Sequence, residues 1–218
     1  MSEFLLEIYG EEIPSSSQKL IESELRRLLS ELFTEFDVKF DTIKTFSTSR
    51  RVVVLINNLS KYSSQKQKEV RGPRVNANEN AIKGFLKSKK IINIDDLSKK
   101  EINGKLYYVY TENSDVKNVK DLLEDQVPLI LRSIRWIKSM RWGDHEDRWI
   151  RPIKNILCIY EKKILNFEFV ALKSNNFTFG NYFYGEKKMK CIDFESYEKN
   201  LRNNHVIIQR LDREVLIM

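Results

Sequence analysis

The feature of this sequence that most constrains its fold is a run of apolar side chains at helical spacing near the N-terminus. They recur at steps of one, three and four residues, which places them on one face of a helix. These side chains are Leu20, Ile21, Leu25, Leu28, Leu29 and Leu32. Pro14 precedes the run, and Ser15 with Gln18 has the spacing of a capping box. The pattern predicts an amphipathic helix that begins near residue 15.

Short extended segments lie on both sides of this helix. Phe4–Ile8 and Val52–Ile56 are nearly continuous apolar runs, typical of buried strands, whereas residues 38–41 alternate as a half-buried strand does. The other predicted elements are a polar strand at 65–70, helices at 77–90, 115–138, 194–202 and from 209, a hairpin at 101–109, and strands at 155–160, 164–171, 175–184 and 187–192. This order predicts an α+β fold of two mixed lobes with short, mostly antiparallel sheets and packed helices.

The length of 218 residues fits one large domain or two small ones. We expect a boundary near residues 113–114, which separates an N-terminal α+β lobe (1–113) from a second α+β lobe (114–218). The sequence closes on Leu216, Ile217 and Met218, an apolar stretch inside a predicted helix. We therefore expect the second lobe to be truncated at its C-terminal end.

Composition excludes several classes of protein. The 41% hydrophobic content excludes a disordered chain, and no apolar run approaches the ~20 residues of a membrane span. The first residues lack the positive segment of a signal peptide. Cys158 and Cys191 are 33 residues apart, with no second Cys or His near either, so we expect buried, reduced thiols. These features predict a cytoplasmic protein without a membrane partner.

The net charge of +7 is unevenly distributed. Residues 1–37 carry −6, residues 38–105 carry +10, and residues 106–218 carry +3. This change of net charge along the chain predicts a central region that faces a polyanion. The alternative is a generally lysine-rich composition in which these side chains form an ordinary solvated surface.

Residues suited to catalysis are sparse. The seven glycines are isolated, so no phosphate-binding loop is present, and His145 lies in a charged stretch that we expect to be a solvated loop. His205 has the context of a turn residue. Glu11 and Glu12 form a carboxylate pair, but adjacent side chains on a loop point apart, which supports acid–base chemistry only weakly. We expect neither catalytic nor metal-binding residues in this chain.

Arginine provides the strongest candidates for binding. A guanidinium group presents a planar set of donors suited to phosphate. The candidate phosphate-binding residues are Arg50, Arg51, Arg71, Arg74, Arg141 and Arg151. Trp136, Trp142 and Trp149 lie in the same region as the last two and are suited either to stacking on bases or to forming a core. Both interpretations stay open from the sequence.

Four ordered motifs carry a family resemblance. The segment Leu6–Pro14 resembles Glu-Ile-Gly-x-Glu-Glu-Leu-Pro, Phe46–Val52 resembles a Thr-Pro-Arg-Arg-Leu segment, and Arg71–Pro73 matches Arg-Gly-Pro. The most specific match is Lys138–Gly143 followed by Ile150–Ile153. Together they resemble the N-terminal part of the β subunit of the bacterial heterotetrameric glycyl-tRNA synthetase.

The chain also departs from that family. The family's Gly-His-Arg-Phe is Gly180-Asn181-Tyr182-Phe183 here, without its two basic side chains, and Ser49 replaces a proline. Tyr9-Gly10 stands where the family has glycine and a small residue. Family β subunits are about three times longer, so a diverged, shortened or fragmentary copy is expected.

The resemblance implies a role as one subunit of an ATP-dependent glycine–tRNA ligase. In that family the α subunit binds ATP and activates glycine, and β contributes tRNA binding and the α2β2 assembly. ATP is therefore expected in the holoenzyme and no cofactor in this chain. The six candidate arginines are expected either to contact tRNA or to brace loops through carboxylates such as Glu11 and Glu12. The alternative function is a non-catalytic protein-interaction scaffold without RNA contact.

Overall fold

The computed structural model describes residues 2–64, 67–89, 91–102, 104–113, 115–185 and 187–218. The chain forms two compact units, which we call the main unit (Met1–Ser64 with Lys117–Met218) and the inserted unit (Gln65–Val116). This division differs from the single boundary expected at residues 113–114. The predicted polar strand pairs inside the inserted unit, and the chain then returns to complete the sheet of the main unit.

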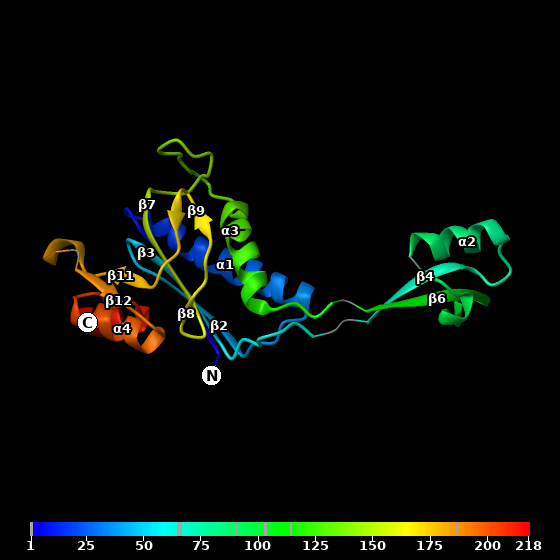
Figure 1. The fold of residues 1–218 in the computed structure, drawn as a ribbon. Coiled ribbons are helices and arrows are strands. Elements are labelled where there is room, and N and C mark those ends of the chain that lie inside the picture. The colour runs from blue at the N-terminus through cyan, green and yellow to red at the C-terminus, as the bar shows by residue number, and fades with distance from the viewer. Residues whose placement is uncertain (1, 65–66, 90, 103, 114, 186) are drawn as a thin grey trace. The chain divides into compact units, whose positions relative to one another are not determined.

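The main unit is built on a five-stranded antiparallel sheet in the order β2-β3-β1-β7-β8 (Figure 1). Its strands are β1 (Glu3–Gly10), β2 (Thr42–Ser47), β3 (Arg51–Asn57), β7 (Ile153–Tyr160) and β8 (Lys163–Ile164). The central strand is β1, in which Leu6 lies opposite Val54 on one side and Cys158 on the other. The first and last segments of the main unit are thus joined through β1.

Two helices cover one face of this sheet, α1 (Ser15–Phe36) and α3 (Val119–Ser133) (Figure 1). The predicted apolar stripe of α1 faces the sheet, where Ile21, Leu25 and Leu29 are buried. Phe4, Leu6 and Ile8 pack in the same core, because alternate residues of β1 point to one face. The apolar face predicted for this helix is therefore the face that packs on the sheet.

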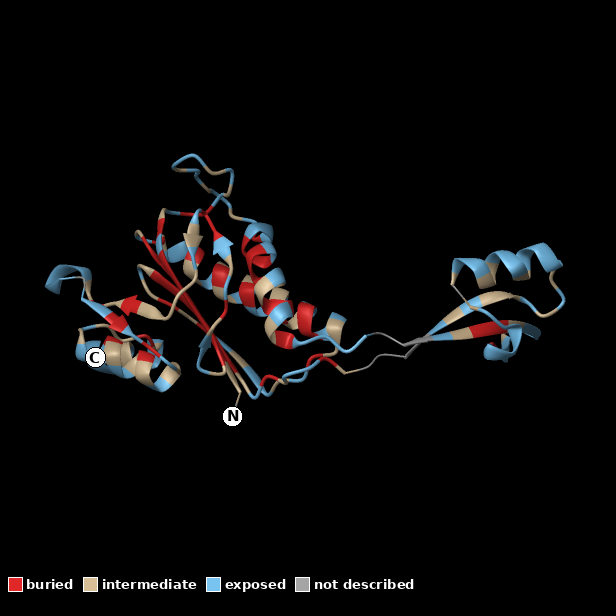
Figure 2. Ribbon diagram, viewed as in Figure 1, coloured by how far each residue is buried: buried red, intermediate tan, exposed pale blue. Residues whose placement is uncertain are grey.

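The opposite face is covered by α4 (Phe194–Asn203) and a small hairpin of β11 (Phe177–Phe179) and β12 (Lys188–Lys190). Leu5, Val53 and Leu157 of the sheet pack there against Tyr197 and Leu201 of α4. Buried residues accordingly concentrate along the sheet in Figure 2. Because both faces are covered, Phe4 through Gly10 of β1 are all buried.

The remaining elements of the main unit are short. They are β9 (Glu168–Phe169), β10 (Leu172–Lys173), the 3-10 turn η2 (Tyr182–Tyr184) and α5 (Arg210–Ile217). Within the main unit, the two segments that precede and follow the inserted unit in sequence are bonded to each other. Ser63 N donates to Lys117 O at 2.9 Å, and Val119 N donates to Lys61 O at 2.9 Å.

The inserted unit contains a three-stranded antiparallel sheet in the order β4-β6-β5, with one α-helix and one 3-10 turn. Its elements are β4 (Gln67–Arg74), α2 (Glu79–Ser88), η1 (Ile94–Asp96), β5 (Ser98–Ile102) and β6 (Lys105–Asn113). Its core is small: Leu97, Tyr108 and Val109 are buried, and no residue of α2 is. Most of this unit is exposed in Figure 2.

Gly84 in α2 offers a test of how stable the inserted unit is. A Cβ added there would meet nothing within 4 Å. We expect Gly84→Ala to stabilise the helix by about 0.5–1 kcal/mol, because alanine loses less backbone entropy on folding. Slower hydrogen exchange of the α2 amides measures this gain. Gly72→Ala is the matched control and should speed exchange, because its Cβ would lie 2.8 Å from the Phe85 ring.

The α+β class and the mostly antiparallel sheets confirm the sequence prediction. The two cysteines are buried and free, as expected, and belong to the cores on opposite faces of the sheet. The described helices all fall short of the length and apolar character that a bilayer crossing requires. Residues Gln65, Lys66, Lys90 and Asn103, which belong to predicted elements, and Ser114, at the predicted boundary, lie outside the described residues.

Several predicted boundaries were wrong. The half-buried strand begins at Thr42 rather than Val38, and α3 ends at Ser133 rather than Lys138. Instead of a capping box, Pro14 occupies the N-cap position and Gln18 Nε2 donates to Ile13 O at 3.2 Å. Two longer predicted strands are broken up as well: 164–171 contains only β9 and the end of β8, and 175–184 contains β11 and η2. Loop turns interrupt both segments.

Candidate functional site

Three segments that are distant in the sequence meet at one end of the main sheet. They are the residues after β1 (10–14), the turn between β2 and β3 (48–51), and the residues before β7 (150–154). Gly10 N donates to Arg50 O at 3.0 Å, Glu11 N donates to Pro152 O at 2.9 Å, and Ile13 N donates to Ser49 O. Three of the four sequence motifs thus converge at this place.

Gly10 is required by the close approach of two of these segments. A Cβ at this position would lie 2.4 Å from the carbonyl oxygen of Pro152, far inside van der Waals contact. The register of β1 against β7 also shifts between Tyr9 and Gly10. Glycine therefore allows the 150–154 segment to lie directly against the end of β1.

The Arg50 side chain connects the turn between β2 and β3 to the residues after β1 and to the η2 turn. The guanidinium lies 3.5 Å from Glu11 Oε2 and 3.4 Å from Glu12 Oε1. It also lies over the ring of Tyr182, 4.3 Å from the centroid. Only 14% of this side chain is exposed, so Arg50 serves mainly to brace the loops.

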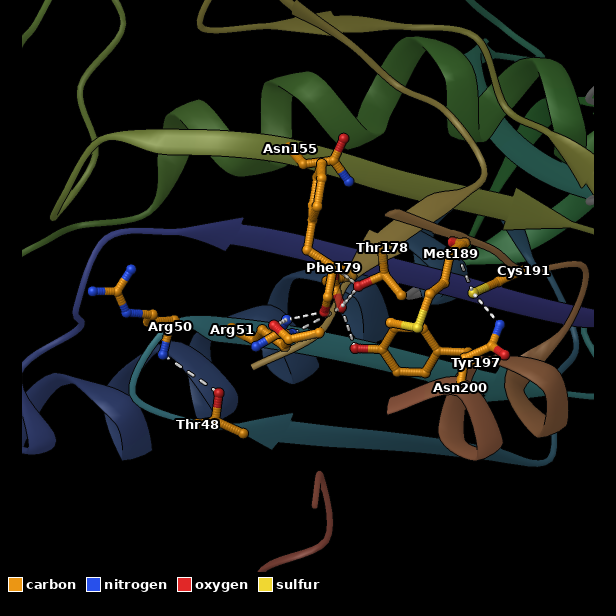
Figure 3. Close-up of polar contacts among 12 residues, drawn as sticks. Thr48, Arg50, Arg51, Asn155, Thr178, Phe179, Met189, Cys191, Tyr197 and Asn200 are labelled. Atoms are coloured by element: carbon orange, nitrogen blue, oxygen red, sulfur yellow. Dashed lines mark hydrogen bonds and ion pairs between the residues drawn. The ribbon is translucent and has the colours of Figure 1, made fainter. Parts of the chain in front are cut away.

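Arg51 points to the opposite side and is buried beneath the hairpin of β11 and β12. Figure 3 shows its guanidinium turned towards the backbone of Phe179, whereas the Arg50 side chain points away. It donates to Phe179 O and, at 3.1 Å, to Gly180 O, and its Nε lies 3.4 Å from Glu7 Oε2. Its guanidinium also stacks on the Tyr9 ring, 4.4 Å from the centroid. These contacts commit Arg51 to the core.

Glu7 is the buried carboxylate at the centre of this cluster. Thr178 Oγ1 donates to it at 2.6 and 2.9 Å, and the Tyr197 hydroxyl donates to its Oε2. Burial raises the pKa of Glu7, although the Arg51 charge acts against that shift. Burial, followed by the negative charge of Glu7, likewise raises the pKa of Tyr197. The cluster fastens the β11–β12 hairpin and α4 to the sheet.

A pocket of about 370 Å³ lies between Arg50 and the η2 turn. Its walls include Gln18, Ser49, Asn181, Tyr182 and His205. His205 adopts a positive φ of 61°, which is compatible with its predicted turn position, and its ring is tilted against Tyr184 with 4.4 Å between ring centroids. The pocket therefore combines aromatic rings with amide and hydroxyl groups.

Two carboxylates of this site are engaged by neighbouring groups. Glu7 is inaccessible, and Glu11 lies 3.0 Å from Lys154 Nζ as well as close to Arg50. The Lys154 contact lowers the pKa of Glu11, which keeps it ionised and unsuited to donate a proton. Among the described residues, no three His, Cys, Asp or Glu side chains gather as metal ligands do.

The other candidate arginines are more exposed. Arg71 and Arg74 lie on β4 of the inserted unit, over the Tyr107 ring at 4.8 and 5.8 Å from its centroid. Arg74 Nε donates to the Tyr107 hydroxyl at 3.3 Å. In the main unit, Arg141 is exposed, and Arg151 is exposed with one bond from Nη1 to Ile150 O at 2.9 Å. The six candidates are therefore distributed over both units.

The tryptophans belong to the core rather than to a stacking surface. Trp149 is buried, and Trp136 packs on it edge-on at 4.8 Å between centroids. Trp142 is partly buried and contacts His145 edge-on at 5.1 Å. His145 thus lies in a loop, as predicted, but its ring is half-buried against Trp142.

Comparison with known proteins agrees with the convergence of motifs. Residues 4–218 match the family model described as glycyl-tRNA synthetase beta subunit. The chain belongs to this family.

Curated members of the family align with the whole chain. The "Glycine--tRNA ligase beta subunit" of Rickettsia typhi is 40% identical over 217 residues, covering 100% of this chain and 32% of that protein. The protein of the same name from Rickettsia bellii is 39% identical over 217 residues, covering 100% of this chain and 33% of that protein. The chain thus spans about a third of the length of the relatives it matches.

Two parts of the site were not identified from the sequence. Glu7 lay within a predicted strand, and its burial with Arg51 depends on a second layer over the sheet. Tyr182, Phe183 and Tyr184 were assigned to a strand, although three consecutive aromatic residues before Gly185 are also compatible with a turn. Tyr182 stands in this turn where the family motif has Arg, and its ring contacts Arg50.

Proposed function

We propose that the chain acts as the N-terminal region of a glycine–tRNA ligase β subunit. It contributes contacts to tRNA and to the α subunit in an α2β2 enzyme, where ATP is bound by α. This enzyme works in the cytoplasm. The observation that carries the proposal is the match, over the whole of this chain, to proteins named glycine–tRNA ligase beta subunit.

The distribution of free cations supports the RNA contact. Arg50 and Arg51 are engaged with carboxylates and backbone carbonyls of the main unit. Arg71 and Arg74 are exposed, and the inserted unit that carries them has a net charge of +4. An exposed arginine beside an aromatic ring suits RNA, because phosphate and base contacts can form side by side. Within the set of six, we assign phosphate contact first to Arg71 and Arg74.

The proposal is tested by glycylation of tRNA with the α subunit and this chain together, against the α subunit alone. Increased glycylation with the chain present supports a functional β region. Equal rates with and without the chain, together with no binding to tRNA in a gel-shift assay, would refute the proposal. Co-purification with and without nuclease separates direct α contact from RNA-bridged contact, and so tests the alternative of a scaffold without RNA.

Substitution of the exposed arginines gives a specific prediction. We expect Arg71→Gln and Arg74→Gln each to weaken tRNA binding and to reduce the slope of log K against log salt by about 0.7–0.9, because each removes one phosphate contact. Fluorescence anisotropy at several salt concentrations measures this slope. Arg27→Gln is the matched control, since Arg27 is paired with Glu24 and Glu31 on α1. An unchanged slope in both variants would remove these residues from the RNA contact.

A further inference from the structure

Three consecutive aromatic side chains project from the turn between β11 and β12. Tyr182 is 48% exposed, Phe183 is 83% exposed and Tyr184 is 74% exposed. The turn is the η2 segment, which extends away from the sheet in Figure 1. Rings of this size usually bury a large apolar area in cores or interfaces, so three exposed neighbours indicate a binding surface.

The backbone of the turn is fixed by its own bonds. Asn181 caps it, with its Oδ1 accepting from Phe183 N at 2.9 Å, and Gly185 ends it with a φ of +93°. Asn181 N donates to Asn204 O at 3.0 Å, which ties the turn to the end of α4. The turn therefore presents its rings from an ordered backbone.

The rings themselves are held by their neighbours. Arg50 and Lys154 both lie over the Tyr182 ring, at 4.3 and 5.4 Å from its centroid. Tyr184 is tilted against His205, and Phe183 stands edge-on to Tyr182 at 5.6 Å. Rings that are oriented before a ligand arrives lose less entropy when they bind it.

The charge around the turn indicates what kind of partner it would take. Lys187, Lys188 and Lys190 follow the turn and are exposed, and Lys188 Nζ lies 3.5 Å from the Phe177 ring centroid. Lysine is depleted in protein–protein interfaces, whereas lysines beside exposed aromatic rings are typical of surfaces that bind single-stranded nucleic acid. The adjacent 370 Å³ pocket is also lined by Gln18, whose amide oxygen is able to accept a hydrogen bond from a base edge.

We propose that Tyr182, Phe183 and Tyr184 form a platform that stacks unpaired nucleobases of RNA. Phe183 and Tyr184 provide the accessible ring faces. Tyr182, which is held by Arg50 and Lys154, packs against Phe183, and the three lysines neutralise the neighbouring phosphates. This inference rests on the proposed contact with tRNA and specifies its chemistry. It places the contact in the main unit, separate from the one assigned to Arg71 and Arg74.

The experiment uses the full chain and two probes: a tRNA transcript for glycine, and a single-stranded oligoadenylate RNA that carries one 2-aminopurine. Stacking on an aromatic ring quenches 2-aminopurine fluorescence. We expect Phe183→Ala and Tyr184→Ala each to weaken oligoadenylate binding about 5- to 100-fold and to reduce the quenching, because each removes one of the two stacking faces. Phe183→Trp should retain both, since it keeps a stacking face. Tyr62→Ala, which removes a 59% exposed ring elsewhere in the main unit, is the matched control.

The outcomes separate this inference from the proposed function. Wild-type affinity and quenching in both alanine variants, with tRNA binding that still depends on Arg71 and Arg74, would overturn the platform and leave the proposed function standing. Absence of RNA binding by the wild-type chain would overturn both. If the alanine variants lose capture of the α subunit at unchanged RNA affinity, the turn is a protein interface and the platform is refuted.

Discussion

Arg51→Met is expected to lower the free energy of unfolding of the main unit by about 3–5 kcal/mol, because it leaves a buried charge without its partner. The Arg51 side chain is 4% exposed, and the Glu7 side chain has no exposed area. Without the guanidinium, the carboxylate retains only the Thr178 and Tyr197 hydroxyls, and the carbonyls of Phe179 and Gly180 lose a donor. Urea unfolding followed by tryptophan fluorescence measures the loss, since all three tryptophans belong to the main unit.

The pH dependence identifies the cause of this loss. Burial raises the pKa of Glu7 above its usual value of 4.5, and removal of Arg51 should raise it further. A carboxyl whose pKa is raised in the folded state favours folding below its unfolded pKa, and that contribution disappears as the pH rises through the folded pKa. The deficit of Arg51→Met should therefore be largest at neutral pH, shrink as the pH falls through the raised folded pKa of Glu7, and be smallest below its usual value of 4.5.

A double substitution supplies the control. Glu7→Leu combined with Arg51→Met removes both charges, so it should recover part of the lost stability. A deficit of equal size at every pH, with no recovery in the double variant, would indicate lost packing rather than an uncompensated charge.

Gly10→Ala is expected to lower the free energy of unfolding by about 2–3 kcal/mol, because the added methyl group has no room. Its Cβ would lie 2.4 Å from the Pro152 oxygen and 3.1 Å from the Ile153 Cα. Both contacts are with backbone, so relief requires the 150–154 segment to move away from β1. The bond from Glu11 N to Pro152 O would then lengthen or break.

The same urea titration measures the effect of Gly10→Ala. Gly84→Ala is the control in the inserted unit, and it should leave the tryptophan-detected unfolding of the main unit unchanged. Both variants add one methyl group, but only Gly84 has open space around it. Wild-type stability in Gly10→Ala would show that the end of β1 and the 150–154 segment separate without cost.

The regular elements were predictable because their patterns record which faces are covered. The spacing of Ile21, Leu25 and Leu29 predicted both α1 and its buried face, and the run Val52–Ile56 predicted a strand that is buried on both sides. The resemblance added the motifs that converge at Gly10, Arg50 and Pro152. Their mutual contacts had no signal in a single sequence.

The remaining features depend on packing over long sequence distances. Glu7 joins Thr178, which is 171 residues away, so no local pattern could predict its burial. The apolar spacing of α3 continues to Ile137, yet the helix ends at Ser133 and Ile137 is 82% exposed. The segment after Ser133 instead places Trp136 against Trp149, a tertiary contact that overrides helical propensity.

The central position of β1 has a consequence for synthesis on the ribosome. The β1 strand pairs with β3 on one side and with β7 on the other, and the inserted unit lies between these two partners in the sequence. From the end of β3 at Asn57 to the start of β7 at Ile153, the ribosome must add roughly 100 residues, which takes about 5–20 s at about 5–20 residues per second. During those seconds the central strand of the main sheet is an open edge, with unpaired backbone groups that other nascent chains can reach.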